Sequence, residues 1–365
     1  MLDWEERDTG NVDREGLRSA AGLARQRAGA AQLVVVRDGA VVLDRAYGCA
    51  PDALFWIFST SKPFVALLVH RLAERGALSL DDPLAKHWPE FGANGKDAIT
   101  IRHVLRHRSG LPVARSPLRD ALAMTDWTAS VRAIERARPR FAPGGGPAYQ
   151  YVSYGFLLGE LLQRVTGTPI RELLAAEILG PLGLRDTHLG LPDAAWPRHV
   201  PIRGRGAGPA ATAAYLNRRP LRQAVIPAAG VSTTARDLAV LYAALAAGGA
   251  LDGVRVLRPE SLRAATTPTS DGTVDALIRL PIRWSQGFQL GGPGLFPQRP
   301  KPMGRTSSPQ AFGHNGSNVC VAWADPTRRL AVAYLTNDLP TRSEGARAQD
   351  AVAEALLAAC PPLPA

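Results

Sequence analysis

The chain has 365 residues, 46% of them hydrophobic, which is enough to bury a large core in one or two lobes. Lys and Arg number 43 against 32 Asp and Glu, which gives a net charge of +11. The arginines are mostly scattered singly, and no nucleic-acid-binding motif with interleaved aromatic residues accompanies them, so we expect a solvated basic surface and no nucleic-acid partner. No uninterrupted apolar run of about 20 residues occurs, so we expect no membrane partner.

The N-terminus and the cysteines favour a cytoplasmic protein. Residues 1–8 are acidic and lack the apolar core of a signal peptide, so a native start here predicts a cytoplasmic location. Cys49, Cys320 and Cys360 have no metal-ligand spacing, and an odd, scattered set predicts reduced thiols. We expect no metal and no other cofactor.

The first predicted elements form a β-hairpin. Gln32–Val36 and Ala40–Arg45 are rich in β-branched residues. They meet at Asp38-Gly39, which is a strong signal for a two-residue hairpin turn. We therefore expect a sheet that begins with these two strands.

A predicted helix follows and carries the most informative motif, the serine and lysine of Ser59-Thr60-Ser61-Lys62. The apolar residues behind the motif have the i, i+3, i+4 spacing of a buried helix that stops near Gly76: Phe64, Leu67, Leu68 and Leu72. Pro63 fits only if the helix begins at about Ser59 or Thr60, because its missing N–H then falls in the first turn. Ser59 and Lys62 would thus lie one turn apart on one face, where the amine can activate the hydroxyl.

The choice of lysine strengthens this interpretation. Only four of the 43 basic residues are lysines. A buried lysine has a lowered pKa and can accept the serine proton, whereas arginine stays charged. The alternative is that Ser59 is an ordinary N-cap.

The middle of the chain is predicted to be mainly helical. Residues from about 85 to 225 are rich in helical periods, including Phe156–Val165 and Ile170–Ile178. Three tyrosines, Tyr149, Tyr151 and Tyr154, lie just before the first of these helices. They can serve proton transfer or simply pack between helices.

The C-terminal part is predicted to return to the sheet. Val319–Ala324 and Leu330–Thr336 are β-rich and joined by the turn Asp325-Pro326-Thr327, and a helix is expected over Ala346–Ala359. His314-Asn315-Gly316 precedes them, and glycine there lets another backbone approach closely. The stretch Gly287–Ser308 is dense in Gly and Pro, and we expect it to line the mouth of a site as a loop.

Four segments together resemble the serine β-lactamase-like superfamily, in the branch of class C β-lactamases, D,D-peptidases and family VIII carboxylesterases. They occur in the family's order: Phe58–Phe64, Leu72–Pro83, His107–Pro112 and Pro227–Leu238. The resemblance implies a β-lactamase/transpeptidase-like α/β (α+β) fold, an antiparallel sheet flanked by helices with a mainly helical insert. The domains expected from it are residues 1–85 with the Ser-x-x-Lys helix, residues 86–225 with the tyrosine motif, and residues 226–365 with the His-x-Gly strand.

The resemblance also implies the remaining site residues. Its second catalytic element is Tyr-x-Asn, and counting back from Gly159 gives Tyr151 as the motif tyrosine, with Tyr149 as the alternative. Ser153 then stands where the asparagine would be, among the substrate-binding residues. The missing amide speaks against efficient β-lactam turnover.

The third family element resembles the His-x-Gly strand. It implies that His314, Asn315 and Gly316 bind substrate and that the N–H groups of Ser59 and Ser317 form the oxyanion hole. Two aromatic residues, Phe55 and Trp56, lie within a turn of Ser59. Trp56 is predicted either to line an apolar substrate site or to belong to the core.

The function expected from these features is that of a serine acyl hydrolase or acyltransferase. Ser59 would attack a small ester, thioester or amide, with Lys62 and Tyr151 handling protons, and water, an alcohol or an amine would take the acyl group. The first alternative is a β-lactamase or D,D-peptidase-like amidase, and the second is a non-catalytic binding protein on the same fold. The sequence does not fix the oligomeric state.

Overall fold

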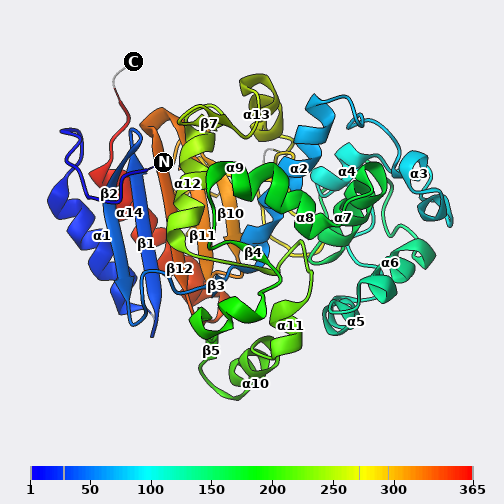
Figure 1. The fold of residues 1–365 in the computed structure, drawn as a ribbon, viewed down its shortest axis with the longest axis horizontal. Helices are drawn as coiled ribbons and strands as arrows, with labels where there is room; N and C mark the ends of the chain where they lie inside the picture. The colour runs from blue at the N-terminus through cyan, green and yellow to red at the C-terminus, as the bar shows by residue number, and fades with distance from the viewer. Residues whose placement is uncertain (1, 28, 271, 295, 364–365) are drawn as a thin grey trace.

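A six-stranded antiparallel sheet forms the centre of the molecule in the computed structural model, which describes residues 2–27, 29–270, 272–294 and 296–363. Its strand order is β2-β1-β12-β11-β10-β9. The strands are β1 (Ala31–Arg37), β2 (Ala40–Tyr47), β9 (Gln289–Leu290), β10 (Phe312–Gly316), β11 (Cys320–Asp325) and β12 (Leu330–Thr336). β1 pairs with β12, so the two ends of the chain build one sheet (Figure 1). The predicted hairpins are confirmed.

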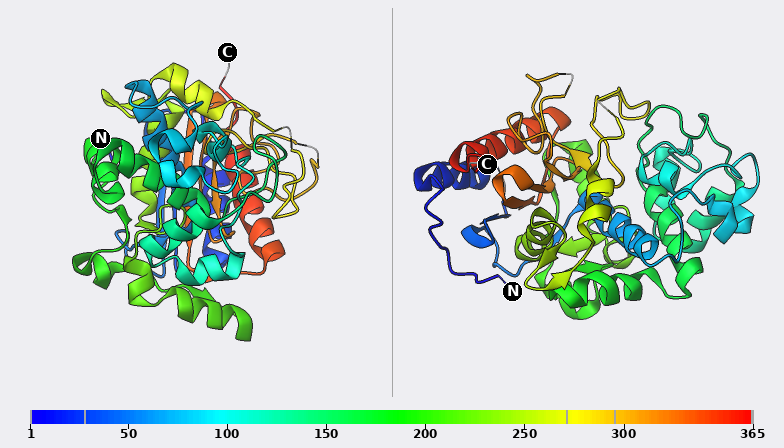
Figure 2. Two further views of the ribbon diagram at one scale, coloured as in Figure 1. Left: turned by 90° about the vertical axis from the view of Figure 1, so that its right-hand side faces the viewer. Right: turned by 90° about the horizontal axis from the view of Figure 1, so that it is seen from above.

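Helices cover both faces of this sheet because its central strands are apolar on both sides. On one face α1 (Arg14–Gln26) and α14 (Arg342–Ala359) pack against each other, as the right-hand view in Figure 2 shows. On the other face α12 (Ala235–Ala246) contacts β1, β11 and β12. α2 (Lys62–Glu74) lies beyond it, between the sheet and the helical part of the molecule (Figure 1).

The helical part is built mainly from the middle of the chain, beside the sheet in Figure 1. α7 (Ser153–Thr166) lies at its centre, in contact with α2, α4 and α6. The other helices are α3 (Leu84–His87), α4 (Ile101–Leu105), α5 (Pro117–Ala123), α6 (Trp127–Arg136), α8 (Ile170–Leu174), α9 (Gly180–Leu182), α10 (Ala207–Leu216), α11 (Arg219–Gln223) and α13 (Pro259–Thr266). The short strands are β3 (Phe55–Trp56), β4 (His188–Leu189), β5 (Arg203–Gly204), β6 (Val231–Thr233), β7 (Ala250–Leu251), β8 (Val254–Arg255) and β13 (Asp338–Leu339).

Three element boundaries differ in detail from the predictions. The nucleophile segment starts as a 3-10 helix over Phe58–Ser61, and regular α-helix begins at Lys62. The predicted helix over Ile170–Ile178 changes to π-helical geometry at Ala175. The C-terminal helix begins earlier than predicted, at Arg342, because Thr341 and Glu344 form a capping box there.

In the part of the chain that the structure describes, no helix is long and apolar enough to cross a membrane. The same residues contain no cluster of three or more His, Cys, Asp or Glu side chains that could hold a metal ion.

Candidate active site

The proposed nucleophile lies in a tight turn between the sheet and α2. Phe58 has a left-handed backbone (φ 49°), and its ring stacks on Trp56 with centroids 5.4 Å apart. Two side chains fix the turn that follows. Thr60 Oγ1 donates to the carbonyl of His314 over 3.1 Å, and Ser61 Oγ accepts from the N–H of Val231 over 3.1 Å. The backbone strain at Phe58 is thus held by packing and hydrogen bonds on both sides of Ser59.

Lys62 is fully buried and has three close partners. Its Nζ lies 3.2 Å from Ser59 Oγ, 2.7 Å from the carbonyl oxygen of Tyr151 and 3.3 Å from the carbonyl oxygen of Ala228. Burial lowers the pKa of Lys62 well below its usual value. A neutral amine has two N–H donors and one lone pair. The two carbonyls can accept the donors, which leaves the lone pair for the hydroxyl of Ser59.

Tyr149 contacts Ser59 and Lys62 through its side chain, whereas Tyr151 contacts Lys62 through its backbone. The ring of Tyr149 lies beneath the Lys62 Nζ, with 4.7 Å between the nitrogen and the ring centroid. Burial raises the pKa of Tyr149, and a hydrogen bond between its phenol and Ser59 offsets part of that increase. Tyr151 offers Lys62 its backbone carbonyl, and its side chain is 36% exposed. The geometry therefore favours Tyr149, the alternative in the sequence analysis, as the tyrosine that serves Ser59.

A buried aromatic cluster supports Tyr149 from below. Its ring stacks on Trp284 at 5.4 Å between centroids and contacts His107 at 4.8 Å. His107 also contacts Tyr154 and Trp284, at 5.0 and 4.6 Å. Burial lowers the pKa of His107 well below its usual value, so this histidine is neutral.

His314 lies on β10 at the edge of the same cluster and is 1% exposed. Its Nδ1 lies 2.8 Å from the carbonyl oxygen of Asn315, which fixes the N–H on Nδ1. Nε2 is buried without a hydrogen-bond partner among the described residues. Burial, together with the charge of Lys62, lowers the pKa of His314 to about 3. His314 is therefore a neutral side chain behind the site.

The turn after β10 presents the second predicted oxyanion donor. Ser317 and Asn318 both have left-handed backbones, with φ of 52° and 55°. Asn315 holds this turn through its side chain, because its Nδ2 donates to Asn318 Oδ1 over 2.6 Å and its Oδ1 accepts from the Asn318 N–H over 2.9 Å. A Cβ at Gly316 would lie 2.1 Å from the carbonyl oxygen of Ile57, so only glycine permits this approach.

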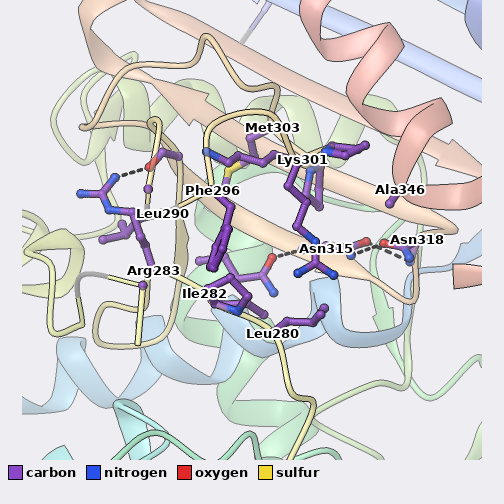
Figure 3. A pocket seen from close by; sticks show the side chains of 18 of the residues that line it. Leu280, Ile282, Arg283, Leu290, Phe296, Lys301, Met303, Asn315, Asn318 and Ala346 are labelled. Carbon is purple, nitrogen blue, oxygen red and sulfur yellow. Dashed lines mark hydrogen bonds between the residues drawn. The ribbon is translucent and has the colours of Figure 1, made fainter. Parts of the chain in front are cut away.

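Not every predicted site residue reaches the substrate side. Ser59, Tyr149, Tyr151, Asn315 and Ser317 line one cavity of about 660 Å³. Figure 3 shows part of this cavity, with Phe296 projecting between Met303 and Ile282.

Two predicted substrate-binding residues point elsewhere. Trp56 is buried, and its indole N–H donates to the carbonyl of Ala229, so it supports the nucleophile turn from behind. Ser153 starts α7 and donates to the carbonyl of Pro112 over 2.9 Å. Neither is among the described residues that line the cavity, and the same holds for His314 and Gly316, so Asn315 alone of the five predicted substrate-binding residues lies in the described lining.

The sequence analysis missed Asp275, which is 0% exposed. Its Oδ1 accepts from the N–H groups of Tyr149 and Leu277, over 3.0 and 2.9 Å. It thereby ties the segment that forms one wall of the cavity to the tyrosine motif. An isolated aspartate in a loop carries no motif, so only the three-dimensional contacts reveal it.

With the geometry described, comparison with known proteins places the chain in a family. The Beta-lactamase family model matches residues 18–357. The curated protein Esterase/beta-lactamase LipL of Mycobacterium tuberculosis is 33% identical over 353 residues, which cover 86% of this chain and 78% of LipL.

Two solved structures share the fold. A penicillin-binding protein homolog from Caulobacter crescentus superposes with a TM-score of 0.78 at 30% identity, covering 94% of this chain and 98% of that one. A family VIII carboxylesterase superposes with a TM-score of 0.79 at 26% identity, covering 92% and 96%. The fold and the site define a serine hydrolase. The chain belongs to the Beta-lactamase family.

Proposed function

We propose that the protein is a carboxylesterase that forms an acyl-enzyme on Ser59, with Lys62 and Tyr149 transferring protons. The observation that carries the proposal is the amine of Lys62, wholly buried and 3.2 Å from Ser59 Oγ. Burial is the cause of its lowered pKa, and no carboxylate among the described residues holds it in the charged form. A non-catalytic binding protein would gain nothing from a buried amine that has no carboxylate partner.

In the proposed reaction Lys62 Nζ takes the Ser59 proton as Oγ bonds to the ester carbonyl carbon. The N–H groups of Ser59 and Ser317 stabilise the oxyanion. The bond to the leaving alcohol then breaks, and Tyr149 gives its phenol proton to the alkoxide and regains one from Lys62. Water attacks the acyl-enzyme by the reverse proton route, which releases the acid and restores Ser59.

The tyrosine assignment makes a direct prediction. Tyr149→Phe keeps the ring packing and removes the phenol, so kcat/KM for p-nitrophenyl butyrate should fall by roughly 10²-fold or more. Tyr151→Phe is the matched control, because it leaves the backbone carbonyl that Lys62 contacts, and we expect a change below about fivefold. Steady-state kinetics of both variants check this. A larger loss in Tyr151→Phe than in Tyr149→Phe would restore Tyr151 to the catalytic role.

The same site should prefer esters to β-lactams. The family motif has an asparagine where this chain has Ser153, and the Ser153 hydroxyl donates to the carbonyl of Pro112. No side-chain amide from this motif therefore lines the cavity in the described structure. We expect kcat/KM for p-nitrophenyl butyrate to exceed that for nitrocefin, with penicillins acylating Ser59 slowly. Parallel assays of both substrates test the ranking. Faster turnover of nitrocefin would favour the β-lactamase or D,D-peptidase alternative.

Transfer of the acyl group to an alcohol or amine is a second candidate. A volume of about 660 Å³ can hold an acyl group and an acceptor together. Mass spectrometry of ester reactions with added alcohols and amines decides between the two fates. Free acid as the sole product across a broad panel would leave hydrolysis alone.

A further inference from the structure

The charged side chains that line the cavity beside Ser59 are all cationic, and the proposed reaction does not use them. Four cationic side chains line it: Arg283, Arg299, Lys301 and Arg347. Among the described residues of the lining there is no Asp or Glu. The rest of the wall is largely apolar, with Ile278, Leu280, Ile282, Leu290, Phe296 and Met303 (Figure 3).

Two of the four cations hold the Gly- and Pro-rich loop, residues 287–294 and 296–308, that lines the cavity. Arg283 donates to the carbonyl of Gly291, and Lys301 Nζ donates to the carbonyl of Gly292 over 2.8 Å. These carbonyls satisfy N–H donors without neutralising the charges. Burial and the charge of Arg283 lower the pKa of Lys301. Like charges are thus packed together at this end of the cavity.

The nearest acids to this loop are already paired. Asp350 lies 3.1 Å from Arg305, and Glu354 lies 4.0 Å from the same guanidinium. Glu354 also accepts from the N–H of Thr306 over 2.9 Å. Asp350 also accepts from the backbone N–H of Lys301 over 3.0 Å, and neither acid is among the described residues that line the cavity.

The other two cations, Arg299 and Arg347, are exposed at the cavity, one on the loop and one on α14. Neither guanidinium has a hydrogen-bond or ion-pair partner within residues 2–27, 29–270, 272–294 and 296–363. The charge of Arg347 contributes to the lowered pKa of Glu344, but the Glu344 carboxylate accepts its hydrogen bonds from Thr341 in the capping box. Both arginines therefore keep their planar donor sets for a ligand.

We propose that the natural acyl donor carries an oxyanion, a carboxylate or phosphate, that binds Arg299 and Arg347. Its apolar part lies against Leu280, Phe296 and Met303, and its reacting carbonyl lies at Ser59. A guanidinium pairs well with either oxyanion, which explains a wall with cations and no acids. This inference rests on the proposed function and names the substrate class for it.

Two matched ester pairs test the proposal. One pair places the charge on the acyl half, mono-p-nitrophenyl adipate against p-nitrophenyl hexanoate. The other places it on the leaving group, 4-carboxyphenyl hexanoate against 4-carbamoylphenyl hexanoate. We expect the anionic member of at least one pair to have about tenfold higher kcat/KM at low salt. The ratio should shrink in about 0.5 M NaCl, because salt screens exposed charges.

The variants assign the preference to the two arginines. In the double variant Arg299→Gln, Arg347→Gln the anionic-to-neutral ratio should fall to about one, whereas Arg299→Lys, Arg347→Lys should retain part of it. The matched control is Arg132→Gln, Arg263→Gln, which removes the same charge at exposed positions outside the cavity lining and should keep the wild-type ratio.

Equal kcat/KM within both pairs for the wild type, or a ratio that survives in the glutamine double variant, would overturn the inference. Either result, with Ser59-dependent hydrolysis of the neutral esters, leaves the proposed function in place. Hydrolysis that is unchanged in Ser59→Ala would instead remove the proposed function.

Discussion

Ser59→Ala should lower kcat/KM for p-nitrophenyl butyrate by roughly 10⁴-fold or more, because it removes the oxygen that forms the acyl-enzyme. The fold should survive, since no described hydrogen bond that holds the turn uses the Ser59 hydroxyl apart from the catalytic contacts with Lys62 and Tyr149. The assay is initial-rate kinetics on the purified variant, with circular dichroism to verify folding.

Ser61→Ala is the matched control for this variant. It lies in the same turn and loses one hydrogen bond to the Val231 N–H, which costs about 1 kcal/mol of stability. Its activity should fall far less than that of Ser59→Ala. Similar losses in both variants would mean that the integrity of the turn, and not the Ser59 hydroxyl, explains the result.

Lys62→Arg should lower kcat by roughly 10²- to 10⁴-fold, because a guanidinium stays charged and cannot take the Ser59 proton. Lys86→Arg is the control, since Lys86 is an exposed lysine paired with Asp82 over 2.8 Å. Near-native turnover in Lys62→Arg would contradict the role of Lys62 as a base.

The pH profile of the wild type should agree with this role. Because burial depresses the pKa of Lys62, the amine is neutral above that lowered pKa and charged below it. Activity should therefore be full above the lowered pKa and fall as the pH drops through it.

Lys62→Met should also raise the melting temperature while abolishing activity, because a buried amine lowers the free energy of unfolding.

Much of the fold was predictable because its signals are local. Asp38-Gly39 joins β1 and β2 as expected, and the apolar spacing after Lys62 gave α2. The pairing of β1 with β12 joins segments about 300 residues apart in the sequence, so no local pattern predicts it. The sequence analysis expected only that the C-terminal hairpin returns to the first sheet. The boundaries suggested for the domains stay predictions.

Only the part of the site whose residues lie one helical turn apart was predictable from local spacing. Ser59 and Lys62 meet because three residues separate them at the start of a helix. The tyrosine could not be settled by counting, because the segment before α7 is irregular and Tyr149 reaches Ser59 while Tyr151 turns its carbonyl to Lys62. Asp275 and the cationic wall arise from segments far from the motif, so no local pattern contains them.

The central claim is that Ser59 is the acylated residue and that neutral Lys62 activates it. It is tested most directly by incubating the protein with a fluorophosphonate and mapping the adduct by peptide mass spectrometry at several pH values. We predict one adduct, on Ser59, absent in Ser59→Ala, with a labelling rate that falls as the pH is lowered through the depressed pKa of Lys62. An adduct on another residue, or a labelling rate unaffected by Lys62→Arg, would contradict the account.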